Sequence, residues 1–224
     1  MSRLQIHPLS EDLVLVECDY GSLRLEDPLL KPILLPFQLE RAVRKRKLDF
    51  LVGRLCAQTG VGHLDQTLGS LPIRIGEKRQ PMWPEGFIGS ISHSQGRACA
   101  IVARNSSYSL VGCDIEHHID SNLDGICKHV CTQKEWDNAQ QELKSFSKTE
   151  LLTLIFSAKE TLYKALFPKV RVYFGFHKAS VQTVSRENIK LKINTDLGPF
   201  KKNQSFTIKV EMRTNSVVFT HLVV

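Results

Sequence analysis

The chain has no long apolar run, and this absence excludes several classes of protein. Of its 224 residues, 42% are hydrophobic. No stretch of about 18 consecutive apolar residues occurs, however, so the sequence predicts no transmembrane helix. The first residues do not place a charged segment before an apolar one, so no secretory signal is expected. Low-complexity segments and short repeats are also absent. We expect a soluble cytoplasmic protein, with peripheral attachment to the inner membrane left open.

The cysteines lack the spacing of a disulfide framework. Three of them lie in apolar strand or helix patterns, as buried free thiols do. Cys127 and Cys131 flank His129, but a second pair at the spacing of a zinc finger is missing. We therefore expect reduced thiols and no zinc site. The six cysteines are Cys18, Cys56, Cys99, Cys113, Cys127 and Cys131.

Acidic residues are in the minority, with 23 Asp and Glu against 30 Lys and Arg and a net charge of +7. Such an excess favours an anionic ligand, an acidic protein partner, nucleic acid or an anionic membrane. The basic run 44–47 lies in a segment with helical spacing, where Arg46 and Arg54 share a face with Phe50 and Val43. An arginine there either extends into solvent or binds a phosphate. A nucleic-acid-binding module stays an alternative, although no known reading motif is present.

Apolar periodicity predicts a mixed α+β chain of two halves, 1–108 and 109–224. In the first half, an alternating stretch at 13–16 precedes a helix over 37–58 that Gly60 and Gly62 end. A three-stranded meander over 88–94, 98–104 and 109–116 follows, its third strand opening the second half. The second half continues with helices over 131–142 and 149–166. It ends in strands over 179–184, 189–193, 206–212 and 217–222.

The strand over 111–116 brings two carboxylates to one face. Alternation places Val111, Cys113 and Ile115 on its apolar face. Gly112, Asp114 and Glu116 then lie together on the other face. An Asp-x-Glu pair of this kind on an exposed strand is more often solvated than bound to a metal.

A second acidic cluster lies on the helix over 149–166. The apolar stripe of this helix is Leu151, Ile155, Ala158, Leu162 and Leu166. Ser157, Glu160 and Lys164 are expected on the opposite face, and Lys159 at the edge of the stripe. Glu160 and Lys164 at i, i+4 are consistent with a simple surface ion pair. Combined with the strand, they are consistent with a Mg²⁺ site, because Mg²⁺ takes oxygen ligands.

These motifs together resemble the signature of the 4'-phosphopantetheinyl transferases. The resemblance rests on V-G-C-D-I-E at 111–116, F-S-A-K-E-x-x-x-K at 156–164 and G-S-I-S-H at 89–93. It is closest to the longer, Sfp-like class, because both acidic clusters occur in one chain. Gly53-Arg54 after the basic run, and K-R-Q-P-M-W-P at 78–84, are similar to the branch that serves siderophore-making peptide synthetases. The similarity covers about residues 40–170.

The resemblance implies an α+β fold of two pseudo-symmetric halves with small antiparallel sheets and a coenzyme A cleft between them. It implies a monomer in which Asp114, Glu116 and Glu160 bind Mg²⁺. Glu160 would act as the general base, and Lys164 would add positive charge at the reacting phosphate. The residues implied in binding coenzyme A are Arg46, Arg54, Lys78, Arg79, Ser92, His93, Lys159 and Lys164. Of these, the resemblance implies that Arg46, Arg54, Ser92 and His93 contact the nucleotide and its 3'-phosphate. Ser92 and His93 alternate along a strand, so only one of these side chains is expected to face the ligand.

The implied reaction transfers 4'-phosphopantetheine from coenzyme A to a serine of an apo carrier domain. The implied carriers are the peptidyl and aryl domains of an enterobactin-like siderophore synthetase. A fatty-acid or polyketide acyl carrier protein is the alternative, because carrier choice depends on surface complementarity. The helix over 131–142 is a candidate docking region for the carrier.

Overall fold

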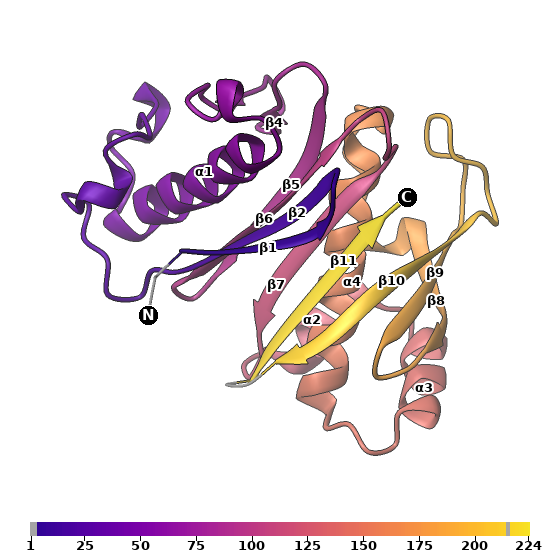
Figure 1. Cartoon of the computed structure of the whole chain (residues 1–224). Coiled ribbons are helices and arrows are strands. Elements are labelled where there is room, and N and C mark those ends of the chain that lie inside the picture. The colour runs from indigo at the N-terminus through magenta and orange to yellow at the C-terminus, as the bar shows by residue number, and fades with distance from the viewer. Residues whose placement is uncertain (1–3, 214–215) are drawn as a thin grey trace. The chain divides into compact units, whose positions relative to one another are not determined.

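The computed structural model describes residues 4–213 and 216–224 (Figure 1). The chain divides into two units, Met1–Val111 with Val223–Val224, and Gly112–Leu222. The predicted boundary after residue 108 lies a few residues earlier. In each unit a long helix packs on a small antiparallel sheet. The predicted α+β class is therefore confirmed.

The first unit is a four-stranded sheet with one helix across it. Its strands lie in the order β1-β2-β6-β5, and every neighbouring pair is antiparallel. The strands are β1 (Leu4–Ser10), β2 (Leu13–Asp19), β5 (Phe87–Ser94) and β6 (Arg97–Arg104). The helices are α1 (Arg44–Leu64) and the 3₁₀ turns η1 (Pro28–Leu30), η2 (Phe37–Leu39) and η3 (Gln66–Leu68). A short hairpin of β3 (Arg74–Ile75) and β4 (Pro81–Met82) completes the unit.

The turn between β5 and β6 is where the sequence predicts it. Ser94 pairs with Arg97, so Gln95 and Gly96 are the two turn residues. Both have positive φ, 41° and 89°. This geometry matches the right-handed twist of the flanking strands. The end of β5, which carries His93, is thereby fixed beside β6.

Helix α1 differs from the prediction at both ends. Residues 37–39 form only a 3₁₀ turn. Phe37 (80% exposed) and Val43 (74% exposed) lie mostly in solvent, so little apolar burial would stabilise a helix that included them. At the other end α1 continues through Gly60 and Gly62. A Cβ on Gly60 would come within 2.6 Å of Val102, so this glycine permits close packing on β6 and does not end the helix.

The second unit is a five-stranded sheet covered by three helices. Its strand order is β7-β11-β10-β9-β8. The strands are β7 (Val111–His117), β8 (Ala179–Val184), β9 (Asn188–Ile193), β10 (Ser205–Arg213) and β11 (Val217–Val223). The helices are α2 (Leu123–Val130), α3 (Gln133–Glu142) and α4 (Lys148–Val170), with a 3₁₀ turn η4 (Phe176–Lys178). β1 and α2 were not predicted. Among the described helices, none is long and apolar enough to cross a membrane.

The predicted three-stranded meander is wrong in its third strand. β6 pairs with β2 along one edge and with β5 along the other, so neither edge of β6 is left for β7. β7 instead pairs with β11 near the end of the chain. Leu110 pairs with Val224, and His118 pairs with Ser216, so the two strands are antiparallel.

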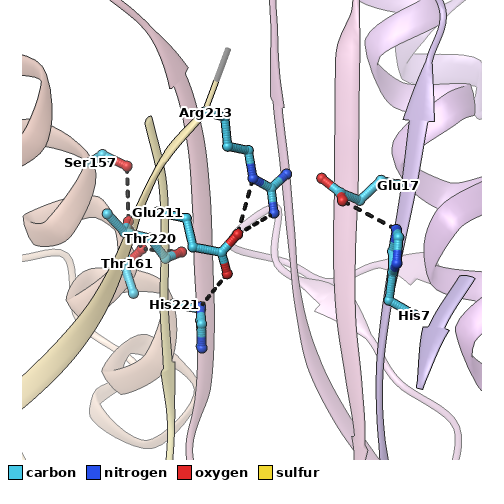
Figure 2. Close-up of polar contacts among 8 residues, drawn as sticks. All are labelled: His7, Glu17, Ser157, Thr161, Glu211, Arg213, Thr220 and His221. Carbon is cyan, nitrogen blue, oxygen red and sulfur yellow. Dashed lines mark hydrogen bonds and ion pairs between the residues drawn. The ribbon is translucent and has the colours of Figure 1, made fainter. Parts of the chain in front are cut away.

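A buried group of hydroxyls joins α4 to β11. Figure 2 shows Ser157 and Thr161 of α4 pointing at Thr220 of β11. The Thr220 hydroxyl lies 2.9 Å from that of Ser157 and 2.6 Å from that of Thr161. All three residues are fully buried. Because buried hydroxyls need partners, these bonds define how α4 is rotated on the sheet.

We expect Gly112→Ala to destabilise the protein by about 1–3 kcal/mol. A Cβ at Gly112 would collide with the carbonyl oxygen of Thr161 and would lie 2.9 Å from Cβ of Ala165, so α4 would have to move off β7. Urea unfolding measures the loss. Gly175→Ala is the matched control, because nothing lies within 4 Å of a Cβ there. Equal stability of both variants would contradict the close approach at Gly112.

Candidate active site

One candidate site lies in the second unit, where β7 meets α4. Gly112 allows the helix to approach, and Asp114, two residues further along β7, faces α4 on the same side of the strand. Nζ of Lys164 on α4 lies 2.6 Å from Oδ1 of Asp114. The Asp114 side chain is only 2% exposed. A carboxylate buried this deeply requires a cation beside it, and Lys164 supplies one.

Glu160 lies one helical turn before Lys164, and its pKa is shifted from the usual value. Burial raises its pKa, the nearby charge of Asp114 raises it further, and Lys164 opposes the shift without cancelling it. Burial acts to lower the pKa of Lys164, but the charge and hydrogen bond of Asp114, together with Cys113 and Glu160, outweigh it, so the pKa of Lys164 is raised overall. Lys164 therefore stays charged, whereas Glu160 takes up a proton more readily than an ordinary glutamate. A general base needs this property.

Glu160 is also accessible to a substrate. It lines a cavity of about 200 Å³ in the second unit. Much of the cavity wall is aromatic, and includes Tyr163, Tyr173, Phe174 and Phe176. Glu160 therefore lies on the wall of a site that a ligand could enter.

The predicted magnesium ligands are only partly brought together. Among residues 4–213 and 216–224, no three His, Cys, Asp or Glu side chains lie close enough to hold a metal ion, and this includes Cys127 and Cys131. Asp114 has Lys164 as its neighbour, and Glu116 follows on the same face of β7. The donor chemistry nevertheless fits Mg²⁺, which commonly uses one or two carboxylates and completes its shell with water and substrate phosphate. The magnesium site stays a prediction.

Two residues of α4 are placed differently from the expectation. The ammonium of Lys159 is 2.6 Å from Oε1 of Glu135 and donates to the carbonyl of Val130 at 2.8 Å, and its side chain is 2% exposed. Lys159 also lines the cavity that Glu160 lines, and its contact with coenzyme A stays a prediction. Ser157 was expected on a face opposite the core, but it is buried against Thr220. The reason is that α4 packs on the sheet and also on α2 and α3, so it has two buried faces.

A separate candidate site is a cavity of about 640 Å³ in the first unit. Its walls come from η2, α1, β5 and the hairpin of β3 and β4. Positive side chains on these walls make it suited to an anion. The basic residues Arg46, Arg54, Arg79 and His93 line the cavity. Asp49 and Phe50 also line it.

Arg54 is the most unusual group in this cavity. It is 8% exposed, and its guanidinium lies 4.9 Å from the ring centroid of Phe50. Burial, and then the charge of Arg46, lower its pKa to about 10, so it remains a cation at neutral pH. Its Nε is buried and has no hydrogen-bond partner among the described residues. A buried cation with an unused donor is stabilised when an anion binds.

Of the six predicted ligand-binding residues in this unit, four line the cavity and two do not. Arg46, Arg54, Arg79 and His93 line it. Arg79 lies in the turn after β3, where it has a positive φ of 65°. Lys78 and Ser92 are not on the wall. Alternation along β5 explains Ser92, which is buried while His93 faces the cavity, as the sequence predicts.

Sequence reasoning missed Asp49. This acid lines a cavity rich in positive charge, and its side chain is 5% exposed. Its spacing could have identified it, because it follows Lys45 by four residues and Arg46 by three on the same face of α1.

The comparisons with known proteins match both units. The model of the 4'-phosphopantetheinyl transferase N-terminal domain matches residues 35–103, and that of the 4'-phosphopantetheinyl transferase superfamily matches residues 110–217. The chain is similar to enterobactin synthase component D of Salmonella typhimurium, with 32% identity over 92% of this chain and 83% of the relative. It is also similar to the 4'-phosphopantetheinyl transferase PptT of Mycobacterium tuberculosis, with 31% identity over 72% of this chain and 70% of the relative. A third relative, the 4'-phosphopantetheinyl transferase Svp of Streptomyces mobaraensis, is 31% identical over 71% of this chain and 60% of the relative.

The chain therefore belongs to the 4'-phosphopantetheinyl transferase family. Enzymes of this family use coenzyme A as a substrate and transfer its phosphopantetheine group to carrier proteins.

The raised pKa of Glu160 predicts a pH-dependent stability. The folded protein protonates Glu160 more readily than the unfolded chain, whose ordinary value is 4.5. This group therefore favours folding at low pH, and its contribution is lost as the pH rises through the folded-state pKa. Glu160→Gln replaces the carboxyl group with an amide, so this position carries no negative charge at any pH. In buffer that contains a metal chelator, we expect Glu160→Gln to have a higher Tm than the wild type at about pH 8. The difference in Tm should shrink towards about pH 4.5.

The control for this measurement is Glu85→Gln, which removes an exposed acid. It should show no such pH-dependent difference. A wild-type protein more stable than Glu160→Gln at about pH 8 would show that the Glu160 charge is stabilised by its surroundings, against the direction of the shift.

Proposed function

We propose that this chain is a Mg²⁺-dependent transferase that modifies the carrier domains of an enterobactin-like siderophore synthetase. The observation that carries the chemistry is the buried Asp114–Lys164 pair one helical turn from Glu160. The siderophore carrier is supported by the similarity to enterobactin synthase component D over most of the chain. Asp114, Glu116 and Glu160 would hold the Mg²⁺, which supplies positive charge to the pyrophosphate when bound.

The cavity of the first unit would bind the nucleotide part of coenzyme A. Arg54, Arg46 and His93 offer positive or hydrogen-bonding groups at one wall, and Arg79 offers another. Guanidinium groups bind phosphate oxygens with two donors at once. The unused Nε of Arg54 supports this assignment, because it provides a donor without breaking an existing bond.

In the second unit, Glu160 would take the proton of the carrier serine. The serine oxygen forms a bond to the phosphorus of the phosphopantetheine group, and the pyrophosphate P–O bond breaks. Adenosine 3',5'-bisphosphate leaves. Lys164, fixed by Asp114, would place a permanent positive charge near the reacting phosphate, where negative charge develops. Fixing Lys164 in advance means that little reorganisation is needed during the reaction.

A fatty-acid or polyketide acyl carrier protein is the second candidate acceptor. It is favoured by the similar identity to PptT and Svp, whose names specify no siderophore. An acidic carrier of either kind would suit the net charge of +7. The helix α3 and its flanks remain our proposed docking region, and the outcome depends on surface complementarity.

We expect Arg54→Ala to raise the KM for coenzyme A about tenfold or more while changing kcat little, because it removes a charge-assisted contact made before the chemistry. Steady-state rates at varied coenzyme A concentration measure both constants, and thermal unfolding checks the fold. The control is Arg41→Ala, which removes an exposed arginine that does not line the cavity. An unchanged KM in Arg54→Ala would remove Arg54 from the site.

Intact-mass spectrometry of an apo peptidyl carrier after incubation with the protein, coenzyme A and Mg²⁺ tests the function directly. We expect the carrier to gain one phosphopantetheinyl group, and EDTA to prevent the gain. Asp114→Asn should lower the rate at least about a hundredfold, because it removes the partner of Lys164 and a proposed ligand. Comparing peptidyl, aryl and fatty-acid carriers identifies the acceptor. Faster modification of the fatty-acid carrier would favour the second candidate, and no modification of any carrier would contradict the proposal.

A further inference from the structure

Asp49 is an acidic residue in a part of the first unit where a negative charge is unfavourable for binding an anion. It places a buried carboxylate on the wall of a cavity that Arg46, Arg54 and Arg79 line. If the cavity binds a phosphate, a fixed negative charge at its wall weakens that binding. Burying a carboxylate is also costly in itself. The position of Asp49 therefore calls for a role that outweighs both effects.

The contacts of Asp49 show what it holds. The hydroxyl of Tyr20 donates to Oδ1 at 2.5 Å. Oδ2 lies 3.5 Å from Nζ of Lys45 and 3.8 Å from Nδ1 of His93. Lys45 is largely exposed, so its pairing contributes little. The partners that are fixed within the unit are Tyr20 and His93.

Tyr20 makes Asp49 a rigid anchor. Burial, and then the hydrogen bond to Asp49, raise the pKa of Tyr20, so its hydroxyl stays a donor. The backbone nitrogen of Tyr20 donates to the carbonyl of Gly96 at 2.6 Å, in the turn just after His93. The same residue thus fixes the carboxylate and the end of β5 on which His93 lies.

The imidazole of His93 lies between Asp49 and Arg46. Nδ1 is on the side of Asp49, and Nε2 is 3.5 Å from Nη1 of Arg46. An anion that binds the Arg46 guanidinium therefore meets the Nε2 edge of the ring. A group that holds one ring nitrogen sets the orientation and the proton position of the other.

We propose that Asp49 is a positioning residue that holds His93 with its Nε2 edge toward the 3'-phosphate of coenzyme A. The proposal rests on the proposed function, since it takes the cavity as the coenzyme A site. It predicts the opposite effect on the affinity for coenzyme A from the effect expected if only the negative charge of Asp49 mattered. If Asp49 acted only through its charge, its neutralisation would strengthen the binding of coenzyme A. If Asp49 positions His93, its neutralisation weakens that binding, and the loss depends on the 3'-phosphate.

The test compares Asp49→Asn with Glu77→Gln by calorimetric titration of the full chain with coenzyme A and with 3'-dephospho-coenzyme A. Glu77 is an exposed acid on the wall of the same cavity, so both variants remove one negative charge from it. We expect Asp49→Asn to bind coenzyme A about tenfold more weakly, in line with one lost charge-assisted contact, and to bind the dephospho form almost unchanged. Glu77→Gln should bind coenzyme A as tightly as the wild type or more tightly.

Several results would overturn the proposal. These are unchanged or tighter binding of coenzyme A by Asp49→Asn, an equal loss for both ligands, or a wild-type protein that does not distinguish the two ligands. If circular dichroism shows that Asp49→Asn does not fold, Asp49→Glu decides by the same comparison, because it keeps the charge but displaces it by one methylene. Failure of the proposed function is recognised separately, because the carrier then gains no mass even when the wild-type protein binds coenzyme A.

Discussion

The contact of β7 with α4 is the constraint on which the second unit depends. At Gly112 the strand backbone touches the helix so closely that any side chain would separate them. That approach brings Asp114 within an ion-pair distance of Lys164. The hydroxyls of Ser157, Thr161 and Thr220 hold the same face of α4 against the neighbouring strand. Together these contacts fix the rotation of α4, and with it the direction in which Glu160 points.

Each unit holds one charged group, Arg54 or Glu160, that burial destabilises and that its proposed ligand would neutralise. In the first, Arg54 is buried with an unused donor, and its pKa is lowered because the cation has lost water. In the second, Glu160 has a raised pKa because burial and Asp114 disfavour its charge. Both groups are destabilised in isolation, and both are relieved by an opposite charge. Strain of this kind is typical of functional sites and costs stability that the surrounding core must supply.

Local periodicity predicted the strands of the second unit well, and the alternation of apolar and polar residues is clearest in β9 and β10. It also predicted the shared face of Gly112, Asp114 and Glu116. What it could not predict were the long-range pairings. β7 pairs with β11, about a hundred residues later, and no local pattern encodes that choice. Gly60 reads as a helix end in the sequence, but it lies inside α1 because β6 approaches there.

Lys159 and Lys164 show the same limit at the site. Both lie on α4 near Glu160, and the family motif has a lysine at each of these two positions. Their partners decide their roles, and those partners come from elsewhere in the chain. Lys159 meets Glu135 of α3, whose other contacts tie the start of α3 to β8. Its ammonium thus serves as an internal link among helices and sheet. Lys164 meets Asp114 and stays 24% exposed, so its charge can also act on a bound phosphate. Two lysines five residues apart on one helix therefore have different partners, and only the fold distinguishes them.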